Sequence, residues 1–286
     1  NRAWRSVEEI QTYLEASKRA FADRALLGDP KFLPYLGDLI AGLIAKDRGE
    51  LLYKLTKRGV TPALQIPPAQ GAPKYFNVPD WKIGTHRESP STSHLSVIDV
   101  EGNAVSLTTT VNYSFGACIV ARGTGILWND EMDDFAIAPG VPNTYGIVGS
   151  EANAVAPGKV PLSSMSPTLV FQGATPDGGL KMVLGSPGGS QIPTTVAQAI
   201  INAIDHNAGA LEAISEGRIH HQHLPDTVFV EPRALDEATY EALRTRGYAL
   251  KMRAPWSNAT LILVDPTTGL ITAAADPRGV GTAAAE

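Results

Sequence analysis

The order of helical and strand patterns along the chain predicts an α+β fold. Amphipathic helical patterns come first, and two groups of short strands follow, separated by a mainly helical segment. Strands and helices do not alternate as they do in a doubly wound βαβ array, so this order favours sheets that are covered by helices. Each predicted element is considered below in chain order.

Composition and charge set the class of protein. The chain has 286 residues, of which 43% are hydrophobic and 19% are charged, as in ordinary globular proteins. It can therefore form one large domain or two ordinary ones. Its net charge of −5 and pI near 5.7 argue against nucleic acid as a partner. No apolar run approaches the roughly 18 to 20 residues that span a bilayer, so we expect no membrane span.

The first ninety residues predict two helices and an irregular segment. Ser6 and Glu9 form a capping box, and apolar residues at helical spacing follow as far as Gly28-Asp29-Pro30. A second helical pattern runs from about Leu39 to Lys57. The stretch from Thr61 to Pro90 contains six prolines and few periodic apolar residues, which predicts an extended segment that can wrap a domain or present a scissile bond.

The stretch from Pro90 to Asn112 predicts a β-hairpin. Its first strand extends to Val100, the turn is Glu101-Gly102-Asn103, and the second strand begins at Ala104. The stretch is rich in threonine, and one interpretation is simply a strand with a solvated polar face.

The register of this hairpin brings hydroxyl groups together. With a three-residue loop, Val100 faces Ala104, and counting outward places Thr92 opposite Asn112 and diagonal to Thr110. Two hydroxyls and an amide then share one face of the hairpin. Such a cluster is a candidate for nucleophilic chemistry.

The segment after the hairpin is acidic and then glycine-rich. Residues 126–128 predict one more short strand, and Cys118 is expected to be a small buried strand residue. The stretch 129–134 contains four carboxylates, which form a solvated loop, a calcium loop or a pocket for a positive charge. The alternating D-x-D-x-D-G spacing of a calcium loop is missing. Residues 139–146 have the composition of a mobile surface loop and could form a lid.

A glycine-rich turn joins the next strands to a helix. Strands are predicted at Thr168–Gln172 and Lys181–Leu184, and a helix from about Thr194 to His206. Between them, Gly185-Ser186-Pro187-Gly188-Gly189-Ser190 can direct backbone N–H groups toward negative charge. An oxyanion hole and a tight turn without a ligand are both compatible with this pattern.

The last third of the chain contains a histidine cluster. No acidic or cysteine ligand stands at a matching spacing to His220, His221 and His223, so we expect a structural role and no metal. The remaining elements are strands at Thr227–Glu231, Ala259–Val264 and Leu270–Ala274 and a capped helix at Asp236–Arg246.

Several of these stretches resemble one family when they are taken together. STSHLSVID, TTTVNYSFG, GTGILWNDEMDDF, PGVPNTYGIVG, PLSSMSPTLV and LGSPGGSQI occur in the order and spacing of the gamma-glutamyltranspeptidases. The resemblance runs from about Tyr13 to Arg278. It implies the four-layer αββα sandwich of the amino-terminal-nucleophile hydrolases, a fold that hosts several amide hydrolases and does not choose the substrate. RIHHQHLPD resembles a segment of this family that is not known as a metal site.

The resemblance implies self-cleavage between Ser91 and Thr92. Residues 1–91 would be the carboxy-terminal part of a large subunit, and residues 92–286 the small catalytic subunit. Thr92 would attack its own preceding carbonyl with help from Thr110. The new α-amine of Thr92, with a reference pKa of about 7.7 to 8, could then serve as the base for its hydroxyl.

The resemblance also implies how a substrate is bound. The backbone N–H groups of Gly188 and Gly189 are the candidate oxyanion donors. Glu131 and Asp134 would meet the α-ammonium of a γ-glutamyl group, with support from Asn112. The matching positions for the α-carboxylate are Ser163 and Ser164, and Tyr145 on the predicted lid would reach Asn112.

The implied reaction is γ-glutamyl transfer from glutathione or another γ-glutamyl amide. Release of the acyl group to water is hydrolysis, and release to an amino acid or dipeptide is transpeptidation; no cofactor is implied. Two alternatives remain: a cephalosporin or glutaryl acylase of the same superfamily, and an uncleaved homologue without activity. Asp134 argues against the acylase, because a glutaryl group has no α-ammonium for it to bind.

One binding group of the family has no match in this sequence. Family members also hold the α-carboxylate with an Arg from the amino-terminal part of the large subunit, and no Arg before Thr92 lies in a matching segment. We therefore expect the chain to need an amino-terminal large-subunit segment, with Arg2, Arg87 and Arg122 as the first possible replacements from within. Periplasmic or extracellular localisation is implied by the family alone.

Overall fold

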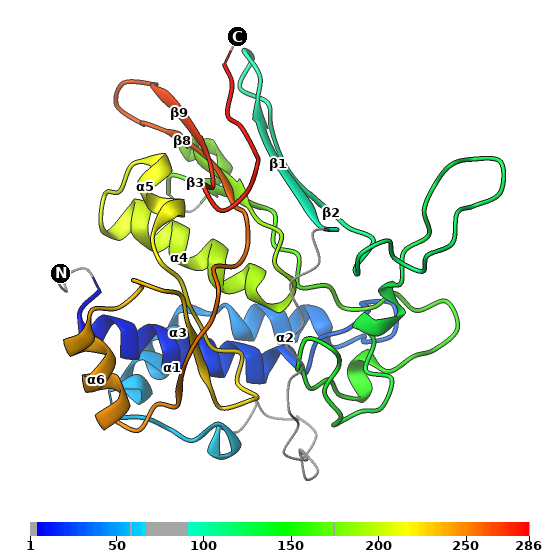
Figure 1. Ribbon diagram of the computed structural model, residues 1–286, viewed down its shortest axis with the longest axis horizontal. Helices are drawn as coiled ribbons and strands as arrows, with labels where there is room; N and C mark the ends of the chain where they lie inside the picture. The colour runs from blue at the N-terminus through cyan, green and yellow to red at the C-terminus, as the bar shows by residue number, and fades with distance from the viewer. Residues whose placement is uncertain (1–4, 58, 67–90, 174, 286) are drawn as a thin grey trace. The chain divides into compact units, whose positions relative to one another are not determined.

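The computed structural model describes residues 5–57, 59–66, 91–173 and 175–285 (Figure 1). The chain forms two compact units, each built from three stretches. Unit 1 comprises residues 1–86, 131–163 and 219–253, and unit 2 comprises residues 87–130, 164–218 and 254–286. Unit 1 thus draws on both sides of the expected cleavage point. The predicted boundary between residues 91 and 92 is a cleavage site and not a boundary between compact units, and it stays a prediction.

The helices of unit 1 begin with α1 (Val7–Arg24), where the predicted capping box is present. The Ser6 hydroxyl accepts a hydrogen bond from the Glu9 N–H at 3.3 Å. The predicted single helix from Leu39 to Lys57 is wrong, because the chain is extended at Ala45 and two helices form in its place. These are α2 (Leu36–Leu43) and α3 (Lys46–Thr56). A 3₁₀ turn follows at Ala63–Gln65, and most of the predicted proline-rich segment lies outside the described residues.

The other half of unit 1 is a small sheet with one helix. Its strands are β5 (Ile219–His220), β6 (Val228–Val230) and β7 (Leu250–Met252); β5 and β6 are antiparallel, whereas β6 and β7 are parallel. Helix α6 (Glu237–Thr245) is capped by Asp236, as predicted. Helix α1 supplies Ile10 and Leu14 to a shared core with Val228, Val230, Leu243 and Tyr248. The core therefore joins residues that are more than two hundred positions apart.

A set of ion pairs around the buried Lys18 fixes the chain near residue 61 in the same unit. The Lys18 ammonium lies 3.2 Å from Glu15 and 3.3 Å from Asp226, and it donates to the Thr61 carbonyl at 3.0 Å. His221 lies 3.1 Å from the same Asp226 carboxylate.

Within the described part of the chain, no group of three His, Cys, Asp or Glu residues could hold a metal ion.

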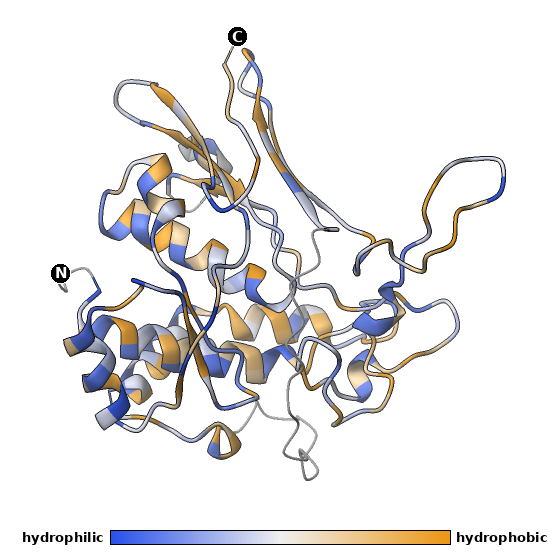
Figure 2. Ribbon diagram, viewed as in Figure 1, coloured by the Kyte–Doolittle hydropathy of each residue, from blue (hydrophilic) through white to orange (hydrophobic). Residues whose placement is uncertain are grey.

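Unit 2 contains a four-stranded antiparallel sheet in the order β3-β4-β8-β9. Helices α4 and α5 pack beside it (Figure 1), and Figure 2 shows hydrophobic residues along its strands. Met182, Leu184, Ile192, Ile214 and Leu261 form the centre of this core. The elements are β3 (Thr168–Phe171), β4 (Leu180–Gly185), α4 (Ile192–Asp205), α5 (Ala210–Ser215), β8 (Thr260–Val264) and β9 (Ile271–Ala275).

The predicted hairpin is present in unit 2, but its register differs. Strands β1 (Ser93–Ile98) and β2 (Ala104–Thr109) pair so that Ile98, and not Val100, faces Ala104. The turn is longer than predicted because Asp99 closes it: one carboxylate oxygen accepts from the N–H groups of Glu101 at 2.9 Å and Asn103 at 2.8 Å. Thr92 therefore lies across from Thr110, and the predicted pairing of Thr92 with Asn112 is wrong.

The two faces of this hairpin are reversed relative to an ordinary amphipathic sheet. Its polar face packs on the four-stranded sheet: the Ser106 hydroxyl donates to the Leu184 carbonyl at 2.8 Å and accepts from the Thr168 N–H at 3.0 Å. Its outer face is apolar and 44% to 51% exposed, and consists of Leu95, Val97, Val105 and Leu107.

Two smaller predictions for unit 2 are also wrong. Cys118 is exposed and lies in a loop with a φ of +55°, so it is not a buried strand residue. Residues 126–128 form no strand, since only an isolated bridge links Val120 to Leu127. Among the described helices of both units, none is long and apolar enough to cross a membrane.

Candidate active site

The hydroxyls of Thr92 and Thr110 are in direct contact. Their Oγ1 atoms are 2.9 Å apart, because Thr92 precedes β1 and Thr110 follows β2 at the open end of the hairpin. The Thr110 oxygen also accepts the backbone N–H of Asn112 at 2.8 Å. One hydroxyl is thereby held by the backbone on one side and by Thr92 on the other.

Asn112 is buried and fixed beside these threonines. Its backbone is left-handed, with a φ of +71°, and its amide nitrogen donates to the Asp130 carbonyl at 3.3 Å. The Asp130 carboxylate accepts from the Tyr113 N–H at 3.0 Å. These bonds tie the end of β2 to the stretch just before the acidic residues.

The glycine-rich turn after β4 has a backbone that demands glycine. Gly188 has a φ of +138° and Gly189 a φ of +55°, and a side chain on Gly188 would meet the Ser257 hydroxyl at 2.1 Å. A 3₁₀ turn, Gly189–Gln191, then leads directly into α4. The turn is in unit 2, as is Ser164.

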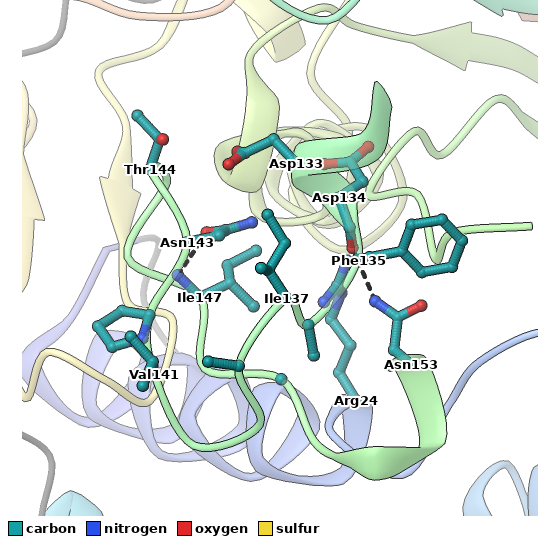
Figure 3. Close-up of a pocket in the computed structure, with 14 residues that line it drawn as sticks. Arg24, Asp133, Asp134, Phe135, Ile137, Val141, Asn143, Thr144, Ile147 and Asn153 are labelled. Atoms are coloured by element: carbon teal, nitrogen blue, oxygen red, sulfur yellow. Dashed lines mark hydrogen bonds between the residues drawn. The ribbon is translucent and has the colours of Figure 1, made fainter. Parts of the chain in front are cut away.

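The acidic stretch lines a pocket of unit 1. Glu131–Asp134 forms a 3₁₀ turn, and the pocket, of about 430 Å³, is lined by Asp133, Asp134 and Arg24 together with the loop around Asn143 (Figure 3). The Asp134 carbonyl accepts from the Asn153 side chain at 2.7 Å, which fixes the end of the turn. Ile137, Val141 and Ile147 provide the apolar part of the lining.

Asp134 is an acid whose charge depends on its neighbours. Burial raises the pKa of Asp134 to about 8, and a hydrogen bond and the negative charge of Glu131 act in the same direction. The Arg24 guanidinium opposes this rise, and Asp133 adds to it. Binding of a cation beside Asp134 and Glu131 would favour the ionised form of Asp134 and so release its proton.

Sequence reasoning missed Arg24. It is the last residue of α1, yet its guanidinium lies in the pocket near Asp134 (Figure 3). It also donates to the Leu162 carbonyl at 3.4 Å, directly before Ser163. More than a hundred residues separate Arg24 from Asp134 in the chain, and no local pattern of α1 marks it.

Tyr145 lies on a loop of unit 1 that is held by hydrogen bonds. The Asn143 side-chain oxygen accepts from the N–H groups of Tyr145 at 3.1 Å and Ile147 at 3.0 Å. The Gln222 amide donates to the Tyr145 carbonyl at 2.8 Å. The loop is thus a small closed turn, and its function as a lid stays a prediction.

The predicted site residues divide between the two units. Unit 2 holds Thr92, Thr110, Asn112, Ser164, Gly188 and Gly189, whereas unit 1 holds Glu131, Asp134, Tyr145 and Ser163. Of the three arginines considered as replacements, Arg122 is exposed in unit 2, and Arg2 and Arg87 lie outside the described residues.

Comparison with known proteins assigns the family. The family model described as gamma-glutamyltranspeptidase matches residues 1–286. The chain belongs to the gamma-glutamyltranspeptidase family. It is similar to the glutathione hydrolase proenzyme of Escherichia coli (strain K12), with 40% identity over 277 residues that cover 96% of this chain and 44% of that protein. The proenzyme of the same name from Pseudomonas aeruginosa is 38% identical over 279 residues, covering 96% of this chain and 46% of the relative. The chain thus spans somewhat less than half the length of these family members.

Solved structures of the family match a shorter part of the chain. A threonine-to-alanine mutant of Helicobacter pylori gamma-glutamyltranspeptidase is 44% identical with a TM-score of 0.62, and the match covers 65% of this chain and 99% of that one. The Pseudomonas nitroreducens enzyme complexed with L-DON is 42% identical with a TM-score of 0.62, covering 68% and 98%.

A more distant structure shows the fold alone. Cephalosporin acylase from Bacillus halodurans is 21% identical, with a TM-score of 0.71 over 96% of this chain and 44% of its own. Together with the family structures, this similarity confirms the predicted α+β fold of the amino-terminal-nucleophile hydrolases.

Proposed function

We propose that this chain carries γ-glutamyl transfer to water, amino acids or peptides, with Thr92 as the nucleophile. The observation that supports it best is the 2.9 Å contact between the Thr92 and Thr110 hydroxyls at the end of the hairpin. Such a pair can serve first in cleavage of the chain and then in catalysis.

Cleavage creates the nucleophile. The Thr92 hydroxyl attacks the carbonyl carbon of Ser91, and the peptide nitrogen leaves and takes up a proton, so that an ester replaces the amide. Water hydrolyses the ester, which leaves a carboxylate on Ser91 and frees both the hydroxyl and the α-amine of Thr92. Thr110 supports this step by holding the attacking oxygen.

Turnover then uses the free α-amine as a base. An α-amine has a reference pKa of about 7.7 to 8, so it can accept the hydroxyl proton near neutral pH. The Thr92 oxygen attacks the γ-carbonyl of the substrate, and the backbone N–H groups of Gly188 and Gly189 stabilise the oxyanion. The leaving amine departs with a proton, and water or the amino group of an acceptor attacks the ester that remains.

The lengths of the family structures support the cut before Thr92. The 195 residues from Thr92 to the end are about 68% of this chain, which equals the share matched by nearly the whole of the P. nitroreducens chain. Curated relatives are named proenzymes, and the structure of an acivicin-inhibited gamma-glutamyltranspeptidase, 44% identical to this chain, reveals roles of its C-terminus in autoprocessing. These observations favour residues 1–91 and 92–286 as the two products.

The carboxyl pair favours a γ-glutamyl substrate over a glutaryl one. Glu131 and Asp134 would bind the α-ammonium, Asn112 would support it, and Ser163 and Ser164 would bind the α-carboxylate. A glutaryl group, the substrate expected for the acylase alternative, carries no ammonium.

The test is a comparison of wild type with Thr92→Ala and Thr92→Ser, followed on a denaturing gel and with a γ-glutamyl anilide. Wild type should separate into two fragments and release the aniline. Thr92→Ala should do neither, and Thr92→Ser, which keeps a hydroxyl, should retain both at a reduced rate. An intact mass that never changes in fresh wild type would contradict the cleavage, and equal turnover of a glutaryl anilide would favour the acylase.

A further inference from the structure

The inward face of the hairpin carries a ladder of polar side chains below Thr92. Side chains alternate along a strand, so Thr92, His94 and Ser96 point to the same side. In the observed register His94 pairs with Thr108, next to the pair of Thr92 and Thr110. His94 is therefore one rung below the proposed nucleophile.

The His94 ring is fixed from both sides of its own hairpin. Nδ1 lies 2.7 Å from the Thr108 hydroxyl, and Nε2 lies 3.2 Å from the Ser96 hydroxyl. Ser96 in turn lies 2.9 Å from the Thr260 hydroxyl of β8. These contacts give the ring one orientation between the hairpin and the four-stranded sheet.

The ring lies directly against the backbone of Gly185. A Cβ on Gly185 would come within 2.1 Å of the His94 Cε1 atom, and Gly185 has a negative φ, so the ring, and not the backbone angle, excludes a side chain there. Gly185 is the last residue of β4 and the first of the turn that holds Gly188 and Gly189. His94 thus lies on β1, two residues after Thr92, and contacts the start of the turn with the proposed oxyanion donors.

We infer that His94 is a positioning residue whose ring sets the separation between the Thr92 strand and the Gly185–Gly189 turn. This inference rests on the proposed function. The reacting carbon must lie close to the Thr92 hydroxyl while its oxygen meets the donors, and a displacement of about 1 Å in such a geometry can cost on the order of a hundredfold in rate. A rigid ring held by hydrogen bonds is a suitable spacer.

The ring is neutral at the pH where the reaction would proceed. Burial lowers the pKa of His94 to about 4, and the groups that face the ring are the hydroxyls of Thr108 and Ser96 and the backbone of Gly185. A neutral imidazole has one donor and one acceptor, which suits two hydroxyl partners. His94 therefore differs from a general base, which would need a pKa nearer the working pH.

The experiment is a double-mutant cycle between His94 and Gly185 in the protein produced from its complete reading frame. His94→Ala removes the spacer and should lower kcat for a γ-glutamyl anilide roughly a hundredfold, while KM stays within about twofold. Gly185→Ala should cause a similar loss because its new methyl group displaces the ring. In the His94→Ala background, Gly185→Ala should cause no additional loss.

Two further variants separate positioning from loss of stability. His94→Phe keeps a ring of similar thickness and should recover about tenfold of the rate lost in His94→Ala. Leu261→Val shortens a buried side chain of the same unit that belongs to its hydrophobic core, and it should lower the melting temperature without changing kcat. If kcat in His94→Ala falls only as the folded fraction falls, or if the Gly185→Ala loss is additive, the inference is overturned.

The rate of cleavage before Thr92 provides a readout that needs no substrate. It should fall in His94→Ala and recover in part in His94→Phe, whatever acyl group the mature enzyme accepts. A wild type that cleaves but does not use γ-glutamyl anilide would refute the proposed substrate and leave His94 to be judged by cleavage. A wild type that neither cleaves nor turns over substrate would overturn the proposed function and the inference together.

Discussion

Asp134 is a half-buried carboxyl whose ionisation would control recognition of the substrate. Its pKa is raised to about 8 by burial and by Glu131, so most of it is protonated at pH 7. An α-ammonium binds the ionised form, so KM for a γ-glutamyl anilide should fall as pH rises toward 8. It should rise again at higher pH, where the α-ammonium of the substrate loses its own proton. This dependence would be measured as the pH profile of KM.

Asp134→Asn tests the same contact at fixed pH. A charge-assisted hydrogen bond contributes about 1.5 to 3 kcal/mol, so KM for the γ-glutamyl anilide, measured near pH 8 where wild-type Asp134 becomes ionised, should rise roughly ten- to hundredfold. The fall of KM between about pH 6 and 8 should also disappear. A glutaryl anilide serves as the control substrate, and equal losses on both would favour the acylase.

Arg24 should set the pH at which this carboxyl becomes charged. Its guanidinium lowers the pKa of Asp134, which burial and Glu131 raise. Arg24→Met should therefore move the falling limb of KM to higher pH and raise KM at pH 7. The control is Arg48→Met, which removes the ion pair between Arg48 of α3 and Asp23, the neighbour of Arg24 on α1. If the pH dependence of KM moves equally in both variants, the effect of Arg24 is not specific.

Sequence motifs predicted the chemistry of single residues better than they predicted which residues lie next to each other in the fold. Thr92 and Thr110 were expected close together, and they are. Arg24 and His94 were missed because Arg24 lines a pocket with residues far from it in the sequence, and the His94 ring packs against Gly185, a glycine with no side chain to indicate a contact. A single sequence offers no signal for such contacts. The alternation of side chains along a strand did, however, place His94 on the same face as Thr92.

Among the elements, the turn between β4 and α4 should tolerate no side chain at Gly188. Gly188→Ala would strain a backbone with φ of +138° and meet the Ser257 hydroxyl. Alanine keeps the backbone N–H, but the strain and the contact should displace it from the oxyanion. Loss of one oxyanion donor typically lowers kcat by about 10² to 10³, and a fall of up to this size is the expected result in a steady-state assay. Adding Ser257→Gly to Gly188→Ala should recover part of the lost kcat, because it removes the contact with the Ser257 hydroxyl and leaves only the backbone strain.

Gly179→Ala is the matched control for that substitution. Gly179 also has a positive φ, of +89°, but its Cβ would point into open space. Its replacement should lower the melting temperature and leave kcat unchanged. If Gly179→Ala lowers kcat as much as Gly188→Ala does, the effect belongs to stability and not to the turn.

Element type was predictable from periodicity and capping, whereas register and breaks were not. The Ser6 and Asp236 caps marked the starts of α1 and α6 correctly, because they satisfy backbone N–H groups locally. The hairpin register was wrong because the Asp99 side chain extends the turn, which apolar alternation does not reveal. Helical periodicity likewise did not locate the break at Ala45, where the backbone between α2 and α3 is extended.

At the scale of the molecule, cleavage before Thr92 should leave the fragments together. The core of unit 1 packs Ile10 and Leu14 of the first fragment against Val228, Leu243 and Tyr248 of the second. The Tyr248 hydroxyl also donates to the buried Glu15 carboxylate at 3.0 Å. Cleaved protein should thus elute from a sizing column as one species and separate only on a denaturing gel.

Leu14→Ala should weaken this association. Replacing a fully buried leucine costs about 2 to 5 kcal/mol, so the variant should release the fragments at a lower urea concentration. Leu51 is 55% exposed on α3, and Leu51→Ala is the matched control. Fragments that separate in wild type without denaturant would show that this core does not hold the two parts of unit 1 together after cleavage.

The Asp99 turn has a practical consequence for engineering the protein. Its hydrogen bonds are local, Val100 is fully exposed, and the turn lies at the opposite end of the hairpin from Thr92. At about 3.3 Å per residue, the six residues of β1 keep the two ends roughly 20 Å apart. A short epitope inserted after Val100 should therefore report on the newly formed fragment without touching its reactive end.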